Sequence, residues 1–456
     1  MGDAVLSYLI DFLEGLPDAP ASNVADSLPF ARTLREQVPE RGTQDFDALL
    51  ATVKEAASHA FETAGPGYLA YIPGGGLFSA ALADFVATCV NRFVNLWSPA
   101  PAFVQIEATV IEWISAMFHL PPTAGGILTS GGSMANFSAL VTARRARLPE
   151  DFLRGTIYAS DQTHASVAKA AMLAGFPPAN VRALPTDEHL RIVPVTLAEA
   201  LERDRAEGFT PFCLVANAGT TNTGAVDPID ELANVAQREE LWLHVDAAYG
   251  GFFQLTERGR TAFQGIERAD SITLDPHKAM FLPYGTGCLL VRDRALLRQA
   301  HQVQASYLQD LAAEEELPNY SDYSPELSRD FRGLRIWLPL KLHGLDAFRS
   351  ALDEKLDLTR VLYDGLAEIP GIQRLGEPDL TVVAFRFDPG SGDADELSRQ
   401  LLERINGSKR VFLSSTMIEG RFTIRACIVS HRTHRDRIDE AVEIIRRCAA
   451  ELVAGS

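Results

Sequence analysis

The sequence has little positive charge and few residues that could cross-link it. It contains 42 Lys and Arg against 60 Asp and Glu, and the net charge of −18 argues against nucleic acids and anionic membranes as partners. The five cysteines are odd in number and widely spaced, without the spacing of a zinc site or a disulfide framework. We therefore expect reduced cysteines in a cytoplasmic protein.

Long apolar runs are also missing. No stretch approaches the roughly 18 apolar residues that a membrane-spanning helix needs. The amino terminus carries Asp3, Asp11 and Glu14 and lacks the basic segment that begins a signal peptide. We expect no membrane partner.

The composition is that of a globular protein with a large core. At 456 residues, 46% apolar and 22% charged, the chain has room for two or three domains. Apolar segments at residues 212–217, 241–245, 272–274 and 287–291 are predicted to be strands, and a helix is expected at 229–237. Strands that alternate with helices imply a largely parallel sheet covered on both faces.

Two residues that follow such strands could carry chemistry. Lys278 is expected on a loop just beyond the carboxyl end of the strand at 271–274, where loops often carry function. A lysine there can form a Schiff base with a carbonyl compound if its surroundings keep some of it deprotonated. Asp246 ends the strand at 241–245, and a carboxylate held away from water needs a cation or a donor. Taken singly, Lys278 could be a solvated surface residue, and Asp246 could cap a helix or bind a metal.

A glycine turn is expected between a short apolar strand and a helix at 134–147. Gly132 in this turn lets backbone amides approach an anion closely, and the helix start adds unpaired N–H groups and a positive dipole. A phosphate group would satisfy both, although Ser133 could equally be a plain N-cap.

The sequence around these residues resembles that of a known enzyme family. The resemblance is carried by His244-Val-Asp246-Ala-Ala-Tyr, by Asp275-Pro-His-Lys278 and by Ser130-Gly-Gly-Ser-Met-Ala-Asn136. These strings resemble the group II pyridoxal-phosphate (PLP) decarboxylases, which include the aromatic-L-amino-acid, histidine and glutamate decarboxylases. The resemblance covers nearly the whole chain.

It implies an α/β fold of the PLP-dependent transferase type I, which is aspartate-aminotransferase-like. That fold has a mainly parallel seven-stranded sheet in the large domain and a small C-terminal α/β domain. We expect an N-terminal helical segment at 1–95 that clasps the partner subunit, a PLP-binding domain at 96–345 and the small domain at 346–456. The implied assembly is a homodimer with shared active sites.

The resemblance also implies roles within the site. Lys278 would hold PLP as a Schiff base, Asp246 would keep the ring nitrogen protonated, and His164 would stack on the ring. His277 is a further candidate proton carrier. The residues expected to contact the cofactor are Gly132, Ser133, His164, Thr221, Asp246, Ala248, His277 and Lys278. The implied reaction is decarboxylation of an L-amino acid to the corresponding amine.

A substrate pocket is implied at five further residues, namely Tyr71, Ile72, Gly74, Asn95 and Arg425. Ile72 and Asn95 replace the larger or aromatic residues usual in the aromatic-amino-acid enzymes, so the pocket is expected to differ from theirs. Arg425 lies in an apolar strand and needs an anionic partner, which is either a structural carboxylate or that of a ligand.

Three matters stay open from the sequence. The polar segment at 302–329 resembles a family loop whose tyrosine donates the final proton, and either Tyr320 or Tyr323 could be that residue. Asp275 replaces the Asn frequent before Pro-His-Lys, and an acidic residue suits a phosphate poorly, so it is not assigned to phosphate binding. The reaction could also be that of an oxygen-consuming aldehyde synthase, an aminotransferase or a carbon–carbon lyase, or the chain could be a non-catalytic homologue.

Overall fold

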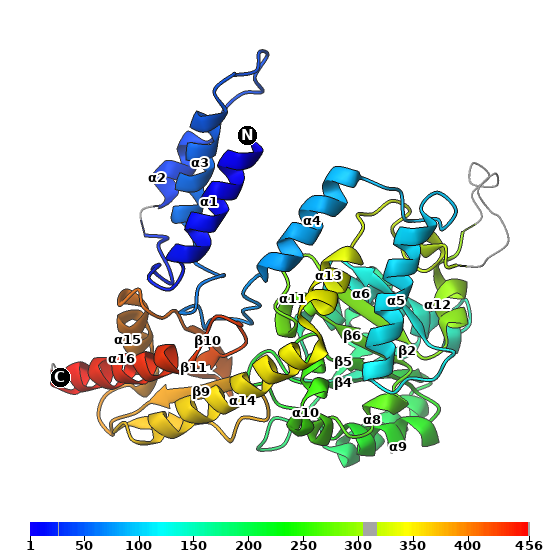
Figure 1. The fold of residues 1–456 in the computed structure, drawn as a ribbon. Coiled ribbons are helices and arrows are strands. Elements are labelled where there is room, and N and C mark those ends of the chain that lie inside the picture. Colours follow the sequence, from blue (N-terminus) through cyan, green and yellow to red (C-terminus); the bar gives the residue numbers. More distant parts are fainter. Residues whose placement is uncertain (26, 304–316, 455–456) are drawn as a thin grey trace. The chain divides into compact units, whose positions relative to one another are not determined.

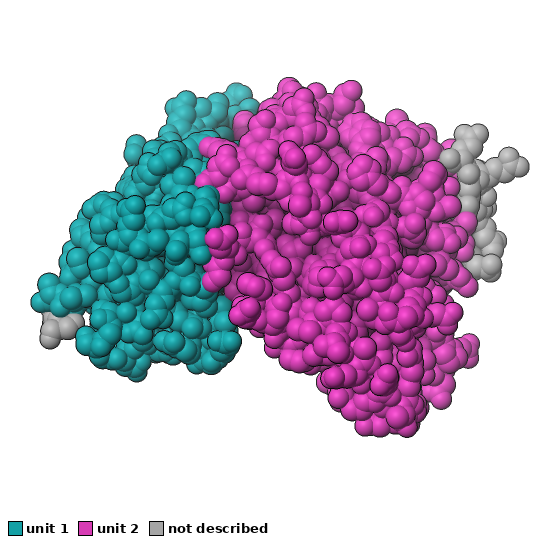
Figure 2. All heavy atoms as spheres, turned by 90° about the horizontal axis from the view of Figure 1, so that it is seen from below, with its two compact units in different colours: residues 1–75, 358–375, 383–456 teal, residues 76–357, 376–382 magenta. Residues whose placement is uncertain are grey.

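A computed structural model describes residues 1–25, 27–303 and 317–454, which fall into two compact units. Figure 2 colours the two units separately. Unit 1 comprises residues 1–75, 358–375 and 383–456, and unit 2 comprises residues 76–357 and 376–382.

Unit 2 is built on a seven-stranded sheet (Figure 1). Its strands are β1 (Gly125–Thr129), β2 (Gly155–Ser160), β3 (Val181–Leu184), β4 (Thr210–Asn217), β5 (Trp242–Asp246), β6 (Ser271–Leu274) and β7 (Gly287–Val291). The order in space is β1-β7-β6-β5-β4-β2-β3. Strand β7 runs antiparallel to both β1 and β6, and the pairs from β6 through β3 are parallel. Strands β1 to β6 therefore point the same way, and the expected mainly parallel sheet is confirmed.

Helices and short helical turns of unit 2 connect and cover these strands. They are α4 (Phe78–Val90), α5 (Pro101–Met117), α6 (Gly132–Arg147), α7 (Ala165–Leu173), η1 (Pro178–Asn180), α8 (Pro194–Ala206), α9 (Ile229–Arg238), η2 (Gly251–Leu255), α10 (Glu257–Ala262), η3 (Ile266–Arg268), α11 (Pro276–Ala279), α12 (Arg294–His301), η5 (Tyr320–Asp322) and α13 (Leu334–His343). Helix α6 packs across β4 to β7, and α8 and α9 contact β4. All five residues of β5 are buried, as expected for a strand covered on both faces.

Unit 1 holds a smaller sheet with strand order β10-β11-β9-β8. Its elements are α1 (Gly2–Gly15), α2 (Ser27–Thr33), α3 (Phe46–Ser58), β8 (Ile372–Arg374), β9 (Val382–Phe387), α15 (Ala394–Gly407), β10 (Ser414–Ile418), β11 (Arg421–Cys427) and α16 (Arg435–Ala454). Helix α14 (Leu345–Ala367) begins in unit 2 and ends in unit 1. Its C-terminal part joins α15 and α16 in an apolar core against β9 and β11, with Leu362, Phe385 and Ile445 among its members.

The compact units divide the chain differently from the three expected domains. They are defined by contacts within one chain, whereas the expected segment at 1–95 is defined by contacts with a partner subunit. The domain boundaries at 95 and 345 therefore stay predictions. Within the described ranges, no helix is both long and apolar enough to span a membrane.

Candidate active site

A pocket of about 300 Å³ lies at one edge of the large sheet. Because β1, β2, β4, β5 and β6 are parallel, their carboxyl ends meet at this edge, which is where open α/β sheets bind ligands. Each of these strands delivers pocket residues directly after its last residues: Ser130 to Ser133, His164, Gly219 to Thr221, Asp246 and Ala248, and Asp275 to Lys278. Convergence of strand ends therefore assembles the site from segments distant in sequence.

Asp246 is a buried carboxylate that faces this pocket. Its side chain is at the end of β5, and the residue is only 6% exposed. Its Oδ2 accepts a hydrogen bond from Asn136 Nδ2 at 2.9 Å, and its Oδ1 accepts one from the backbone N–H of Ala248 at 3.2 Å. A carboxylate offers about four lone-pair positions, so Asp246 has room for another donor.

Lys278 forms a close ion pair with Asp275. Its Nζ lies 3.0 Å from Asp275 Oδ2, and both residues line the pocket. Lys278 lies in the single turn of α11, which begins at Pro276, and not on the loop that we predicted. Proline is favoured at the first helical position because its missing N–H would have no partner there. Asp275 is 2% exposed, and its Oδ1 has no hydrogen-bond partner among the residues described.

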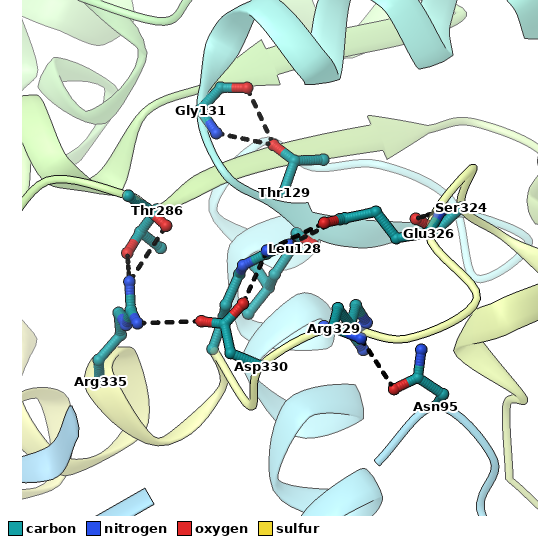
Figure 3. Close-up of polar contacts among 12 residues, drawn as sticks. Asn95, Leu128, Thr129, Gly131, Thr286, Ser324, Glu326, Arg329, Asp330 and Arg335 are labelled. Carbon is teal, nitrogen blue, oxygen red and sulfur yellow. Dashed lines mark hydrogen bonds and ion pairs between the residues drawn. The ribbon is translucent and has the colours of Figure 1, made fainter. Parts of the chain in front are cut away.

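The glycine turn leads into the amino terminus of α6. Its N-cap is Gly131, which offers no side-chain cap, and the first turn of α6 contains no acidic residue. A Cβ on Gly132 would lie 2.9 Å from Asp275 Oδ2 and 3.1 Å from Ala248 Cβ, so a side chain there would crowd the pocket. Thr129 Oγ1 bonds to both Gly131 O and Gly131 N (Figure 3). The N–H of Met134 bonds to Gly131 O, so the N–H groups of Gly132 and Ser133, which begin α6, are those suited to meet an anion.

His277 is fixed by a charged network beneath the turn. Its Nδ1 lies 2.7 Å from the backbone oxygen of Thr286, whose hydroxyl accepts a hydrogen bond from Arg335. Arg335 in turn pairs with Asp330, as Figure 3 shows. Burial lowers the pKa of His277 below its usual value, and the opposing effect of the neighbouring Asp275 offsets only part of this. The segment that carries Asp330 and Arg335 therefore supports the wall of the pocket.

All eight residues predicted to contact the cofactor line this one pocket. They are Gly132, Ser133, His164, Thr221, Asp246, Ala248, His277 and Lys278. Their individual roles stay predictions.

Several polar residues around the pocket were not predicted from the sequence. Asn136, Ser166 and Asn217 line it, and His244 lies behind it. For two of them, the spacing in the sequence indicated a place near the pocket. Asn136 is one helical turn after Gly132, and His244 shares a face of β5 with Asp246 because side chains alternate along a strand.

Four of the predicted substrate residues lie outside unit 2, which holds this pocket. Tyr71, Ile72, Gly74 and Arg425 belong to unit 1. Arg425 is 3% exposed and donates to Ser414 Oγ at 2.9 Å and to Tyr71 O at 3.1 Å. Their contact with a substrate stays a prediction.

Asn95 is fully buried within unit 2 and bonded at both ends of its amide. Its Nδ2 donates to Leu327 O at 2.8 Å, and its Oδ1 accepts from the N–H of Arg329 at 3.3 Å (Figure 3). Asn95 thus anchors the segment after the two candidate tyrosines, and its expected contact with a substrate stays a prediction.

Tyr320 and Tyr323 line a second pocket, of about 730 Å³. Tyr320 is 2% exposed, and the guanidinium carbon of Arg329 lies 4.8 Å from the centre of its ring. Burial raises the pKa of Tyr320, and the nearby Glu107 raises it further. The other residues of the expected loop, 304–316, lie outside the described part of the chain, and the choice between the two tyrosines stays open.

Glu107 and Arg329 form an ion pair beneath Tyr320 in which neither side chain is exposed. Their nearest N and O atoms are 2.8 Å apart. We expect Glu107→Gln to lower the free energy of unfolding by about 3–5 kcal/mol, because Arg329 would keep a buried charge without a counter-ion. Denaturant unfolding of cofactor-free protein measures this. Asp364→Asn removes a surface partner of Arg360 and should cost no more than about 1 kcal/mol. Equal effects of the two changes would contradict the prediction.

The pocket has the donor set that PLP needs. A buried carboxylate suits a protonated ring nitrogen, an uncapped helix start suits a phosphate, and a lysine suits an aldehyde. Asp275 is the one discordant group beside the turn, and Lys278 at 3.0 Å offsets its charge. The residues present therefore fit the cofactor.

Comparison with known proteins agrees with this geometry. The family described as "Pyridoxal-dependent decarboxylase conserved domain" matches residues 30–388. An aromatic-L-amino-acid decarboxylase of Bacillus atrophaeus is 35% identical over 99% of this chain and 95% of its own. A phenylacetaldehyde synthase of Arabidopsis thaliana is 27% identical over 99% of this chain and 96% of its own.

Among solved structures, that of Oryza sativa TDC with PLP and tryptamine superposes with a TM-score of 0.94 at 28% identity. The match covers 99% of this chain and 97% of that one. The expected type I fold, the PLP cofactor and the carboxy-lyase class are thereby confirmed. The chain belongs to the pyridoxal-phosphate-dependent decarboxylases of group II.

Proposed function

We propose that this enzyme converts an L-amino acid into the corresponding amine and CO2, with Lys278 as the residue that holds PLP. The observation that carries the proposal is the meeting of Lys278, Asp246, His164 and the glycine turn in one pocket. Each comes from a different strand end, and together they offer an amine for the aldehyde, a carboxylate for the ring nitrogen and backbone N–H groups for the phosphate.

Each of these residues has a physical reason for its proposed role. When bound, PLP supplies a sink for the electron pair that loss of CO2 leaves behind. Asp246 stabilises a proton on the ring nitrogen because its charge is held with little water near it. Lys278 exchanges with the amino group of the substrate, and His164 supports the ring and the substrate carboxylate. Tyr320 or Tyr323 returns a proton to the former α-carbon.

Aromatic L-amino acids are the substrate class that we propose first. Relatives that match nearly the whole chain carry the names of aromatic-amino-acid, tyrosine and tryptophan decarboxylases. Tyr71, Ile72, Gly74, Asn95 and Arg425 are the residues proposed to select the side chain. At Ile72 and Asn95 the chain departs from the relatives with aromatic residues there, so we expect its preference within this class to differ from theirs.

An aldehyde synthase is the second candidate function. It is supported by the relative named phenylacetaldehyde synthase, whose match spans the chain. Retention of His164 and of a tyrosine in the segment at 302–329 favours formation of the amine, since replacements there accompany the oxidative branch of the family.

A cytoplasmic homodimer is the proposed form of the enzyme. Helices α1 and α3 have no buried residue within their own chain, and each exposes large apolar side chains. Leu6, Ile10, Leu49 and Val53 are between 41% and 57% exposed. An apolar surface of this kind is typical of a protein interface. Sedimentation velocity tests the proposed dimer.

The test of the reaction is mass spectrometry of the products. PLP-loaded enzyme is incubated with a mixture of standard and common non-standard L-amino acids, and the products are compared with those of cofactor-free enzyme. We expect one amine that is lighter than an added amino acid by one CO2. An aldehyde with ammonia and peroxide would move the enzyme to the second function, and a keto acid would contradict both.

A further inference from the structure

A continuous line of buried hydrogen bonds runs behind the pocket. Trp242 Nε1 donates to Ser271 Oγ at 2.8 Å, and Ser271 Oγ lies 2.8 Å from His244 Nδ1. His244 Nε2 lies 3.0 Å from Asn136 Oδ1. Trp242, Ser271, His244 and Asn136 are each at most 1% exposed. No solvent is needed to complete this line.

The line divides at the amide of Asn136. Asn136 Nδ2 donates to Asp246 Oδ2 and to Ser166 Oγ, each at 2.9 Å. Ser166 Oγ in turn lies 2.8 Å from Nδ1 of His164. One amide group therefore contacts, directly or through one hydroxyl, the two side chains expected to meet the ring of PLP.

The direction of each bond follows from the groups themselves. An ionised carboxylate only accepts, so the Asn136 amide must point its two hydrogens at Asp246 and Ser166 and its oxygen at His244. His244 Nε2 must then donate. Burial lowers the pKa of His244 to about 4, against the opposing effect of Asp246, so the ring is neutral. Its Nδ1 accordingly accepts the hydroxyl hydrogen of Ser271.

The tautomer of His164 likewise follows from the hydrogen bonds that its ring makes. The backbone N–H of Ser166 donates to His164 Nδ1 at 3.2 Å, and a nitrogen that accepts this bond carries no proton. The hydroxyl of Ser166 receives a hydrogen from Asn136 and gives its own to the same nitrogen. The proton of neutral His164 therefore lies on Nε2, so this nitrogen can donate within the pocket that His164 lines.

We propose that Asn136 is a positioning residue that orients two side chains at once, the carboxylate of Asp246 directly and the ring of His164 through the hydroxyl of Ser166. It holds one oxygen of Asp246 so that the carboxylate keeps its orientation toward the ring nitrogen of PLP. It also orients the hydroxyl of Ser166, which helps to hold the ring of His164 at Nδ1, the nitrogen that the backbone N–H of Ser166 already keeps unprotonated. Neither effect requires Asn136 itself to take part in the reaction.

The test compares Asn136→Ala with Ser138→Ala. Ser138 is buried on the same helix, α6, and its hydroxyl makes no hydrogen bond to any described residue. For Asn136→Ala we expect affinity for PLP, measured by titration without substrate, to fall about 10- to 100-fold through loss of a hydrogen bond to a charged group. The pH at which the visible absorption of bound PLP changes should shift by about one unit. Ser138→Ala should match the unchanged enzyme in both.

A second variant separates the two branches. Ser166→Ala removes the hydroxyl bond to His164 Nδ1 and leaves the backbone N–H bond to that nitrogen and the bond from Asn136 to Asp246. The ring of His164 is then held by one bond fewer, so kcat should fall while the PLP affinity and the absorption stay near those of the unchanged enzyme. Ser166→Ala also tests the proposal if Asn136→Ala does not fold.

The proposed role of Asn136 is contradicted if Asn136→Ala and Ser138→Ala have the same affinity for PLP and the same pH dependence of the visible absorption. The proposed effect on His164 is contradicted if Ser166→Ala leaves kcat unchanged. Only the kcat measurement rests on the proposed function. Failure to find a decarboxylated substrate would leave the binding and absorption results valid as a test.

Discussion

Replacing Lys278 by alanine is expected to abolish turnover almost completely. The variant lacks the only amine that the structure places in the pocket among the described residues, so PLP can be held by non-covalent contacts alone. Loss of proton transfer by a positioned group accounts for about 10²- to 10⁴-fold by itself. Lost covalent attachment adds to this. Steady-state kinetics with the identified substrate measures the effect.

Lys169→Ala is the matched control for this change. Lys169 is an exposed lysine on α7, close in sequence to His164, and it does not line the pocket. The control should keep its activity and its visible absorption, whereas Lys278→Ala should lose both. If Lys278→Ala retains a substantial fraction of the activity, another residue holds the cofactor and the site assignment is wrong.

Asp246→Asn should cause the second largest loss of activity. An asparagine has nearly the same shape and can keep the bond from Asn136, but it carries no charge to stabilise a proton on the ring nitrogen. Without that charge, the electron sink that PLP would supply for decarboxylation would be weaker. We expect kcat to fall about 10²- to 10³-fold, which is the usual cost of removing one electrostatic contact to a developing charge.

Asp161→Asn controls for the loss of a carboxylate at the same edge of the sheet. Asp161 follows β2 directly, but it is exposed and does not line the pocket. Its replacement should leave kcat nearly unchanged. Comparable losses in Asp161→Asn and Asp246→Asn would show that general charge at this edge matters, and not a specific contact with the ring.

The sequence allowed the strands to be predicted for a simple physical reason, whereas the full set of cofactor residues was predicted from the family resemblance. Short apolar segments such as Ser271–Leu274 have few alternatives in a buried parallel sheet, and polar residues directly after them are carried to a common edge. Lys278 and Asp246 could be placed together on these grounds. The glycine turn before α6 followed from the local needs of an anion site.

What the sequence could not show depends on contacts between distant residues. The bond from Asn136 to Asp246 joins residues 110 positions apart, and its direction follows only from the groups around it. The burial of Tyr320 against Arg329 likewise depends on how the segment after 317 packs. Local sequence patterns indicate neither the Asn136–Asp246 bond nor the burial of Tyr320. The pairing of Asp275 with Lys278 was also missed, although their spacing of three residues suits a single helical turn.

Lys278 is the residue that we propose to hold PLP in the pocket formed by the strand ends. Reduction of the cofactor-loaded enzyme with borohydride fixes the Schiff base, and mass spectrometry of a proteolytic digest then locates the attached group. We predict a phosphopyridoxyl group on Lys278 and on no other lysine. A label on a different lysine, or a loaded enzyme that gains no label, would contradict it.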